Sequence, residues 1–254
     1  MQNESGILYL LPTPLGENTE TIPLYNQTLI ETLRIFVVEE IRTARRFLRK
    51  IIPAFPLDDC QFYILNEHTV STLNLHEPIQ LLLQGQNIGM LSEAGLPCIA
   101  DPGSELVMLA QEKNIRIIPL AGPSSVFMAL MASGLCGQHF TFHGYLPAEK
   151  TKLVAKLRNL EQVSGLQHQT QLFIETPYRN HSLFETILKT CKSHTFLSLA
   201  CNISSEDEYI KTKTIQQWRQ TVCPQLHKKP CVFALLATGN NAPELLSPNA
   251  VLIK

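Results

Sequence analysis

One loop of this sequence combines the residue types that a small-molecule site needs. Residues 91–103 read Leu-Ser-Glu-Ala-Gly-Leu-Pro-Cys-Ile-Ala-Asp-Pro-Gly and hold two glycines, two prolines and two acids. Gly95 removes a side chain where a ligand can approach the backbone, and Asp101-Pro102-Gly103 shapes the entry to the next helix. The length and stiffness of this loop favour a segment that wraps a small molecule, with a plain structural turn as the simpler alternative.

Two further glycine–proline loops lie beside apolar runs. Residues 12–16 (Pro-Thr-Pro-Leu-Gly) follow the first run, and residues 121–125 (Ala-Gly-Pro-Ser-Ser) precede a stretch of small residues. Ser124 and Ser125 place hydroxyl and free N–H groups at the start of a predicted helix, where they can hold a ligand or simply cap the helix. In open parallel sheets, ligands bind in loops of this kind, beyond the carboxyl ends of the strands.

A row of basic residues is the other feature of the sequence that could bind a ligand. The spacing i, i+3, i+4, i+7 and i+8 on one predicted helix is occupied by Arg42, Arg45, Arg46, Arg49 and Lys50. These residues share one face, and the apolar residues of the segment share the opposite one. Such a face can contact RNA phosphates, or it can be ordinary solvated surface.

The elements that must carry these loops alternate between strands and helices. In the first half, short apolar runs predict strands at residues 7–11, 35–38, 62–65, 88–91 and 116–120. The segments between them predict helices at residues 29–33, 42–51, 78–83 and 105–112. This alternation implies an α/β fold with a parallel sheet covered by helices on both faces.

The second half repeats the pattern less regularly. Helices are expected at residues 124–133, 150–160 and 183–191, and strands at residues 172–175, 196–203, 208–213 and 231–237. The strands at 196–203 and 208–213 are joined by a short polar turn, which is typical of an antiparallel pair. We therefore expect an N-terminal α/β domain at 1–120, a C-terminal α/β domain with a mixed sheet at 121–240, and a loosely ordered tail at 241–254.

Composition narrows the class of protein. The 254 residues carry a net charge of −1, so an anionic partner would need a local basic patch. Seven cysteines without a Cys-x-x-Cys pair favour reduced thiols over a disulfide framework or a zinc site. The N-terminus lacks a signal-peptide pattern, and no apolar run approaches the roughly 20 residues that span a bilayer. The sequence predicts a soluble cytoplasmic protein without membrane contact.

Motifs of several other enzyme classes are missing. The chain has no G-x-G-x-x-G, G-x-x-x-x-G-K-[ST], G-x-S-x-G or H-E-x-x-H sequence, which weakens dinucleotide, P-loop, serine-hydrolase and zinc-protease interpretations. His139 and His143 would share one strand face, but a metal site needs more than two ligands. No metal is expected.

An ordered set of segments resembles a known family. The segments are Leu-Tyr-Leu-Leu-Pro-Thr-Pro-Leu-Gly at 8–16, Val-Glu-Glu-Ile-Arg-Thr-Ala-Arg at 38–45, Asn-Glu-His at 66–68, the loop at 91–103, Ile-Pro-Leu-Ala-Gly-Pro-Ser-Ser at 118–125, Ala-Ser-Gly at 132–134, Phe-His-Gly-Tyr-Leu-Pro at 142–147 and Phe-Ile-Glu-Thr-Pro-Tyr-Arg at 173–179. Together they resemble the tetrapyrrole methylase family, and within it the bacterial 16S ribosomal RNA cytidine 2′-O-methyltransferases.

The chain departs from this family in two places. Glu40-Ile41-Arg42 stands where the family usually has an acidic residue, threonine and arginine, and Glu93-Ala-Gly-Leu-Pro97 stands where Asp-Ala-Gly-Thr-Pro is usual. The C-terminal third resembles the family only loosely. These departures are typical of a divergent subgroup with its own target.

The resemblance implies a fold, a cofactor and a set of contacts. The fold would be that of the class III methyltransferases, a homodimer of chains with two α/β domains and S-adenosylmethionine in the cleft between them. Carried over motif by motif, the implied cofactor contacts are Leu11, Pro12, Gly95, Leu96, Ile99, Ser124, Ser125, Glu175, Asn202 and Ala234.

The implied reaction moves a methyl group from the sulfonium of the cofactor to an acceptor. A ribose hydroxyl is a poor nucleophile, so a nearby base or hydrogen-bond acceptor would help. The candidates near strand ends are Glu39, Glu40, Glu67, His68 and Glu93, and their order of merit stays open. The implied partner is ribosomal RNA or the small ribosomal subunit, with Arg42, Arg45 and Arg46 as substrate contacts.

Two alternatives remain beside the RNA methyltransferase. The acceptor can instead be a tetrapyrrole or another small molecule, which the neutral net charge and the altered loop allow. The chain can also be a non-catalytic protein that binds the cofactor and keeps the fold.

Overall fold

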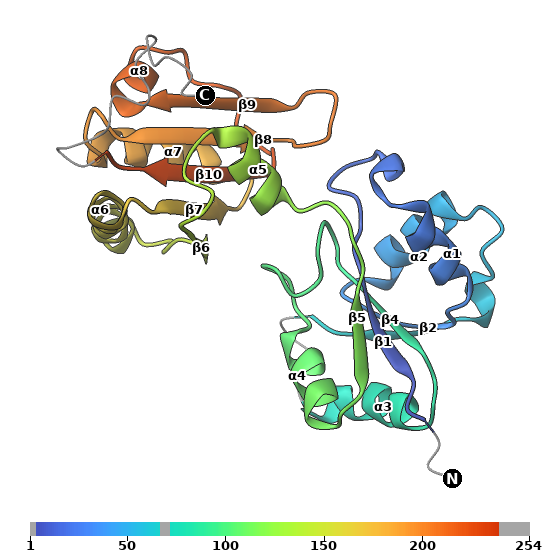
Figure 1. The fold of residues 1–254 in the computed structure, drawn as a ribbon. Coiled ribbons are helices and arrows are strands. Elements are labelled where there is room, and N and C mark those ends of the chain that lie inside the picture. The colour runs from blue at the N-terminus through green and yellow to red at the C-terminus, as the bar shows by residue number, and fades with distance from the viewer. Residues whose placement is uncertain (1–3, 67–71, 239–254) are drawn as a thin grey trace, which may run out of the picture. The chain divides into compact units, whose positions relative to one another are not determined.

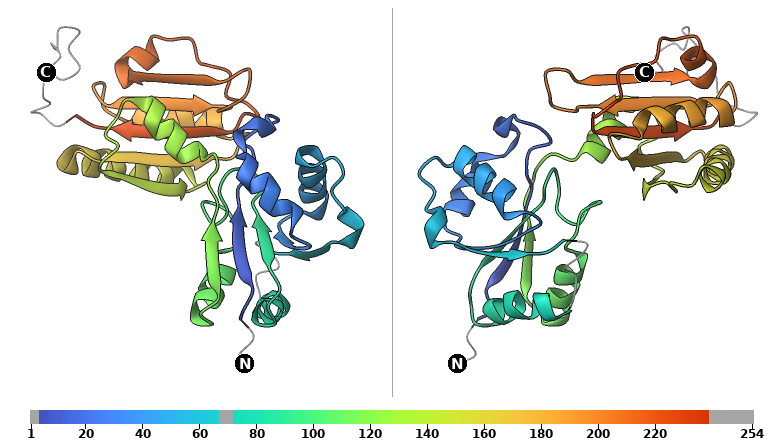
Figure 2. Two further views of the ribbon diagram at one scale, coloured as in Figure 1. Left: turned by 45° about the vertical axis from the view of Figure 1, so that its right-hand side comes forward. Right: turned by 180° about the vertical axis from the view of Figure 1, so that it is seen from behind.

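The chain forms two compact units, Met1–Ser124 and Ser125–Lys254. The structure is a computed structural model that describes residues 4–66 and 72–238. The expected tail at 241–254 therefore lies outside the described residues. Figures 1 and 2 show a sheet with flanking helices in each unit.

The first unit is an α/β layer built on one parallel sheet. Its strands are β1 (Ile7–Leu11), β2 (Ile35–Val38), β3 (Gln61–Ile64), β4 (Ile88–Leu91) and β5 (Arg116–Pro119). Its helices are α1 (Leu24–Glu31), α2 (Ile41–Ile51), α3 (Thr72–Leu83) and α4 (Ser104–Glu112), with short 3-10 turns η1 (Thr19–Thr21) and η2 (Leu57–Asp59). The strand order is β3-β2-β4-β1-β5, with all neighbours parallel, which confirms the predicted parallel sheet.

Alternate side chains of the central strands bury against two helical layers. Leu8 and Met90 pack with the apolar faces of α3 and α4, whereas Leu11 and Phe36 pack with those of α1 and α2. Both faces are covered, so these strands read as continuous apolar runs. The carboxyl ends of the strands, and the loops that follow them, are left to form a site.

Two helices of this unit differ from the sequence expectation. Helix α1 begins at Leu24, directly after Pro23, and ends at Glu31, so the predicted span of 29–33 was too short and shifted. Helix α3 runs from Thr72 through Pro78 to Leu83. The predicted span of 78–83 was therefore too short, and the helix accepts the loss of one N–H donor in its interior at Pro78.

The second unit has a mixed sheet. Its strands are β6 (Phe140–Tyr145), β7 (Thr170–Glu175), β8 (Phe196–Cys201), β9 (Tyr209–Thr214) and β10 (Cys231–Leu236). Its helices are α5 (Ser125–Ser133), α6 (Lys150–Gln167), α7 (Asn180–Thr190) and α8 (Ile215–Arg219). The order is β6-β7-β10-β8-β9, parallel between β6 and β7 and antiparallel elsewhere. The predicted mixed sheet and antiparallel β8–β9 pair are confirmed.

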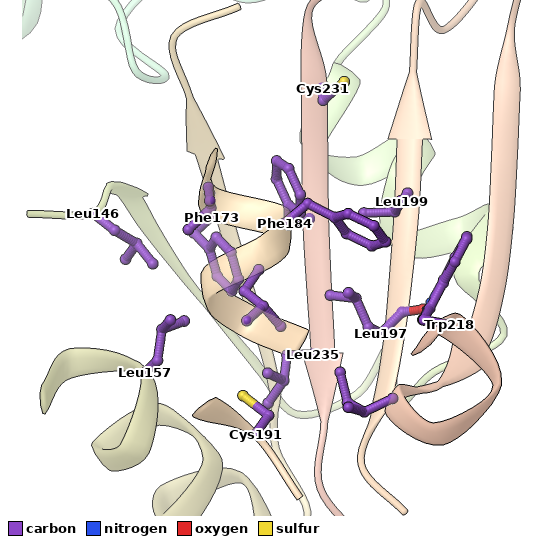
Figure 3. Close-up of a cluster of buried hydrophobic side chains, with 14 of the residues drawn as sticks. Leu146, Leu157, Phe173, Phe184, Cys191, Leu197, Leu199, Trp218, Cys231 and Leu235 are labelled. Atoms are coloured by element: carbon purple, nitrogen blue, oxygen red, sulfur yellow. The ribbon is translucent and has the colours of Figure 1, made fainter. Parts of the chain in front are cut away.

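One face of this sheet carries the main core of the unit (Figure 3). Phe173 of β7 stacks on Phe233 of β10, and Phe184 of α7 meets the Trp218 ring edge-on at 5.5 Å between centroids. The Trp218 indole N–H donates to the Leu197 carbonyl at 2.8 Å, which satisfies its polar atom inside the core. Trp218 therefore serves the packing of this core, and its helix α8 was not predicted from the sequence.

A cysteine pair corrects one expectation from composition. Cys201 and Cys231 lie directly opposite each other on the antiparallel strands β8 and β10, and they form a disulfide. The expectation of reduced thiols is therefore wrong for this pair. Their separation of 30 residues gave no indication, because the pairing depends on a strand register that only the folded sheet defines.

Within the described residues, none of the helices combines the length and the apolar character required to cross a bilayer.

Candidate active site

Two of the predicted loops meet at the carboxyl edge of the first sheet. The Thr13 N–H donates to the Gly95 carbonyl at 2.9 Å, and the Gly95 N–H donates to the Thr13 carbonyl at 3.1 Å. Gly95 has φ of +84°, and a Cβ there would lie 3.2 Å from Leu15 Cδ2. The left-handed backbone explains the glycine, because L side chains disfavour that conformation. We call this pairing the loop bridge.

Buried hydroxyls reinforce the loop bridge. Ser92 Oγ donates to the Gly95 carbonyl at 2.7 Å and lies 3.2 Å from Thr13 Oγ1. Thr13 is 4% exposed and Ser92 is 7% exposed. Sequence reasoning missed both as site residues, because a threonine and a serine in a loop carry no signal of the contact that they make after folding.

On one side of the loop bridge lies an apolar cavity of about 510 Å³, which we call the apolar hollow. The 96–99 segment, α4 and the ends of β1 and β5 enclose it. Its lining residues are Leu10, Leu96, Pro97, Cys98, Ile99, Ser104, Val107, Met108, Gln111, Pro119 and Leu120. Its volume and its mainly apolar lining are typical of small-molecule sites. Leu96 and Ile99, both predicted cofactor contacts, line it.

Leu11 and Pro12 do not line the apolar hollow. The Leu11 side chain is fully buried in the core. The Pro12 ring lies against Gly122, where an added Cβ would come within 2.3 Å of Pro12 Cβ and Cγ. The side chains of Leu11 and Pro12 therefore have structural roles. Pro12 fixes the approach of the loop at 121–125, and the absence of a side chain at Gly122 allows that approach.

On the other side of the loop bridge lies a smaller polar cavity of about 150 Å³, which we call the polar hollow. It is enclosed by the 13–19 segment, α2 and the residues that follow β4. Its polar and charged lining residues are Thr13, Glu17, Thr19, Thr43, Arg46, Lys50, Ser92 and Glu93. Two acidic loop residues, Glu17 and Glu93, thus share a cavity with the basic face of α2.

Three carboxyl groups lie together beside the polar hollow. Glu39 follows β2 and Glu93 follows the neighbouring strand β4, so the parallel sheet brings them close. Partial burial, and then the charge of Glu39, raise the pKa of Glu93, while a hydrogen bond with Thr43 opposes the rise. Burial also raises the pKa of Asp101, which shares a hydrogen bond with Glu39. A carboxylate whose proton affinity is raised in this way is a stronger proton acceptor.

The structure separates the catalytic candidates. The Glu40 carboxylate accepts a hydrogen bond from the Arg42 N–H at 3.0 Å and caps α2, which is a structural role. Glu67 and His68 lie outside the described residues. Glu39 is engaged with Asp101, whereas Glu93 lines the polar hollow. Asp101 joins this group without having been singled out, because sequence alone does not show that the loop folds back onto β2.

The basic face of α2 forms as predicted, with Ala44 and Leu48 buried on the opposite face. Two of its cations are already engaged. Arg45 donates to Asp58 at 3.0 Å and lies over the Phe62 ring, and Lys50 donates to Glu17 at 2.6 Å.

Arg42 is exposed on the first turn of α2, and Arg46 lines the polar hollow. Neither has a carboxylate within ion-pair distance among the described residues. Of the three predicted substrate arginines, Arg42 and Arg46 are therefore better placed than Arg45 to meet an anion.

The remaining predicted cofactor contacts lie at the start of α5 and on or beside strands β7, β8 and β10. Ser124 is buried directly before α5, and Ser125 is its first residue. The Glu175 carboxylate, 2% exposed, holds Arg179 at 2.9 Å and accepts from the Thr176 N–H, so its side chain is occupied. The Asn202 amide donates to Asp207 at 2.8 Å. Ala234 lies in the middle of β10 and is 1% exposed.

The two histidines considered as metal ligands make hydrogen bonds instead. His143 Nε2 pairs with Gln171 at 2.7 Å, and His139 Nε2 pairs with Gln169 at 2.8 Å. Among the described residues, no three His, Cys, Asp or Glu side chains come together in a way that could hold a metal ion.

Known proteins are similar to this chain in sequence and in fold. Residues 8–218 match the family described as Tetrapyrrole (Corrin/Porphyrin) Methylases. The chain is 30% identical over 99% of its length to the ribosomal RNA small subunit methyltransferase I of Pasteurella multocida (strain Pm70), covering 86% of that protein. It is 29% identical to the same enzyme of Haemophilus influenzae, again over 99% of its length and 86% of the relative.

The solved structure of the methyltransferase CobJ has the same fold, with a TM-score of 0.60 and 13% identity over 92% of this chain and 94% of that one. The family match covers far more than half of the chain, and it includes the loop bridge and both hollows. The chain therefore belongs to the tetrapyrrole methylase family.

Proposed function

We propose that this methyltransferase uses S-adenosylmethionine to methylate a ribose 2′-hydroxyl in small-subunit ribosomal RNA. The observation that carries the proposal is the near full-length match to enzymes named for that RNA. The cavities beside the joined loops support it, because one is an apolar hollow suited to a cofactor and the other carries polar and charged residues suited to an acceptor.

The apolar hollow fits the adenosyl part of the cofactor. An aromatic base needs apolar walls and a few polar groups, and Leu96, Ile99 and Met108 supply such walls, with Ser104 and Gln111 at the margin. When bound, S-adenosylmethionine supplies a sulfonium methyl group that is open to in-line attack. The resemblance adds Gly95, Ser124, Ser125, Asn202 and the backbone around Glu175 and Ala234 as proposed contacts.

Glu93 is the proposed proton acceptor for the ribose hydroxyl. It lines the polar hollow, and burial raises its pKa above the ordinary glutamate value, which strengthens it as a base. Asp101 and Glu39, which share a hydrogen bond, act as positioning residues for this carboxylate. Arg46 at the same cavity is suited to a neighbouring phosphate, and Arg42 extends the basic surface.

We further propose that the protein acts in the cytoplasm as a homodimer, as the resemblance implies. Light scattering coupled to gel filtration tests the second point. A mass of one chain at micromolar concentration would contradict it.

The test of the function has two measurements on the purified protein. Calorimetric titration with S-adenosylmethionine should give a dissociation constant in the micromolar range, and Leu96→Arg should weaken it because the new charge projects into the apolar hollow. Transfer of labelled methyl from the cofactor to small-subunit RNA that lacks the modification should follow.

The outcomes separate the alternatives. Binding without transfer to RNA, but with transfer to a tetrapyrrole, would overturn the RNA assignment and keep the enzyme class. Binding without transfer to either would favour a non-catalytic protein. Absence of binding in the wild type would overturn the cofactor itself.

A further inference from the structure

An exposed tyrosine in the second unit has unusual neighbours. Tyr178 lies in the loop between β7 and α7, and its side chain is 70% exposed. The His227 ring meets it edge-on at 5.8 Å between centroids, and Lys228 Nζ lies over the ring at 6.0 Å from its centroid. A single exposed aromatic residue is unremarkable. An aromatic ring that contacts an imidazole and an ammonium group has the composition of a nucleotide-binding surface.

The two loops that carry these side chains are fastened to each other. The Lys228 N–H donates to the Pro177 carbonyl at 3.1 Å, and the side-chain amide of Asn180 donates to the Lys229 carbonyl at 2.7 Å. Asn180 is fully buried, and Leu226 anchors the second loop at 1% exposure. A ligand would therefore find the surface already ordered, with little conformational entropy left to lose on binding.

Of the three basic side chains described near this ring, Arg179 and Lys229 form ion pairs and Lys228 does not. Arg179 is paired with Glu175 at 2.9 Å, and Lys229 is paired with Asp207 at 2.8 Å. Lys228 has no carboxylate within ion-pair distance among the described residues. It also has a left-handed backbone, with φ of +61°, that the hydrogen bond to Pro177 holds in place. The ammonium group beside the ring is suited to a phosphate.

The surface adjoins a residue already proposed for the cofactor. The Asn202 N–H donates to the carbonyl of Pro230, two residues after Lys228, at 3.0 Å. A nucleotide on Tyr178 would thus lie near the residues of this unit that the proposed reaction uses.

We propose that Tyr178, Lys228 and His227 form a stacking platform that holds an unpaired base of the RNA substrate on the tyrosine ring and a neighbouring phosphate on Lys228. The proposal rests on the proposed function for the identity of the RNA. An RNA ligand is favoured over a protein because the ring is flanked by cationic and imidazole groups rather than by aliphatic side chains. Stacking on an exposed ring is how proteins read single-stranded RNA.

Direct binding tests the platform independently of methyl transfer. The probe is a fluorescein-labelled oligocytidine RNA of about 12 nucleotides, followed by anisotropy. Tyr178→Ala should weaken binding about 5- to 100-fold, because base–aromatic stacking has that range of effects. Tyr178→Phe should stay within about twofold, since the ring remains. Lys228→Ala should reduce the slope of log affinity against log salt by about 0.7.

A second exposed tyrosine provides the matched control. Tyr25 of α1 is 67% exposed, and among the described residues no basic side chain lies over its ring. Tyr25→Ala should bind the probe like the wild type. The affinity for S-adenosylmethionine should be unchanged in all four variants, which separates this test from that of the cofactor.

Two results would overturn the platform. One is equal probe affinity for Tyr178→Ala and the wild type, and the other is a wild type that binds the probe no better than serum albumin does. Failure of methyl transfer with intact, Tyr178-dependent RNA binding would instead count against the proposed reaction and leave the platform standing.

Discussion

The loop bridge can be tested by adding one methyl group to it. In Gly95→Ala, the new Cβ lies 3.2 Å from Leu15 Cδ2 and 3.5 Å from the Pro123 carbonyl, so the leucine end must shift by a few tenths of an ångström. The larger effect is the backbone, because φ is +84° and a left-handed L residue costs about 1–2 kcal/mol.

The net magnitude follows from two opposing terms. Alanine also restricts the unfolded chain, which returns about 0.4–1 kcal/mol of stability. The remaining loss of about 1 kcal/mol corresponds to a melting temperature lower by about 2–6 °C. If the cofactor needs the loop in its present conformation, the same strain weakens S-adenosylmethionine binding by about fivefold.

Alanine substitutions at two other glycines distinguish the effect of backbone strain from the effect of the place in the site. Gly134 has φ of +69° with open space around its Cβ position, so Gly134→Ala should lower the melting temperature without changing cofactor affinity. Gly137 also has open space at its Cβ position but no positive φ, so Gly137→Ala should be close to neutral. Differential scanning fluorimetry and calorimetric titration provide both readouts. Cofactor affinity in Gly95→Ala equal to that of Gly134→Ala would refute the role of the loop bridge in binding.

Three further predictions concern charged residues. Glu93→Gln should lower kcat by about 100-fold and leave the cofactor affinity unchanged. Because the folded state raises the pKa of Glu93 above 4.5, the stability of the wild type falls as the pH rises between the unfolded and folded pKa values of this residue. The variant should therefore melt at a higher temperature than the wild type at about pH 8, and at the same temperature below the unfolded pKa value. Arg46→Ala should raise KM for RNA, and its effect should exceed that of Arg45→Ala, whose guanidinium is already paired with Asp58. Glu161→Leu should destabilise the protein to urea by about 1–3 kcal/mol, because the buried carboxylate accepts from a backbone N–H and a hydroxyl.

The elements that the sequence predicts best are the strands buried on both faces, because each appears as a run of consecutive apolar residues. The strands at 7–11, 35–38 and 88–91 are buried on both faces, and their apolar runs gave the bounds that the structure confirms. Helix ends were less accurate, since α1 starts at Leu24 and α3 continues through Pro78. Local propensity does not contain that information.

The same distinction between local sequence signals and tertiary contacts holds for the candidate site. The loop at 91–103 was found from its glycines and prolines, which restrict the backbone whatever the fold. The Thr13–Ser92 contact, the Asp101–Glu39 hydrogen bond and the Cys201–Cys231 disulfide were missed, because each joins residues that only strand order brings together. The structure also reassigned Glu40 from a catalytic candidate to a helix cap.

The central claim is that this chain places a methyl group on a ribose of small-subunit ribosomal RNA. Mass spectrometry of nucleosides and fragments from that RNA, taken from cells with and without the gene, tests it most directly. We expect one 2′-O-methylated nucleotide to disappear with the gene, to return with the wild type, and to stay absent with Glu93→Gln. An unchanged map of ribose methylation would contradict the account.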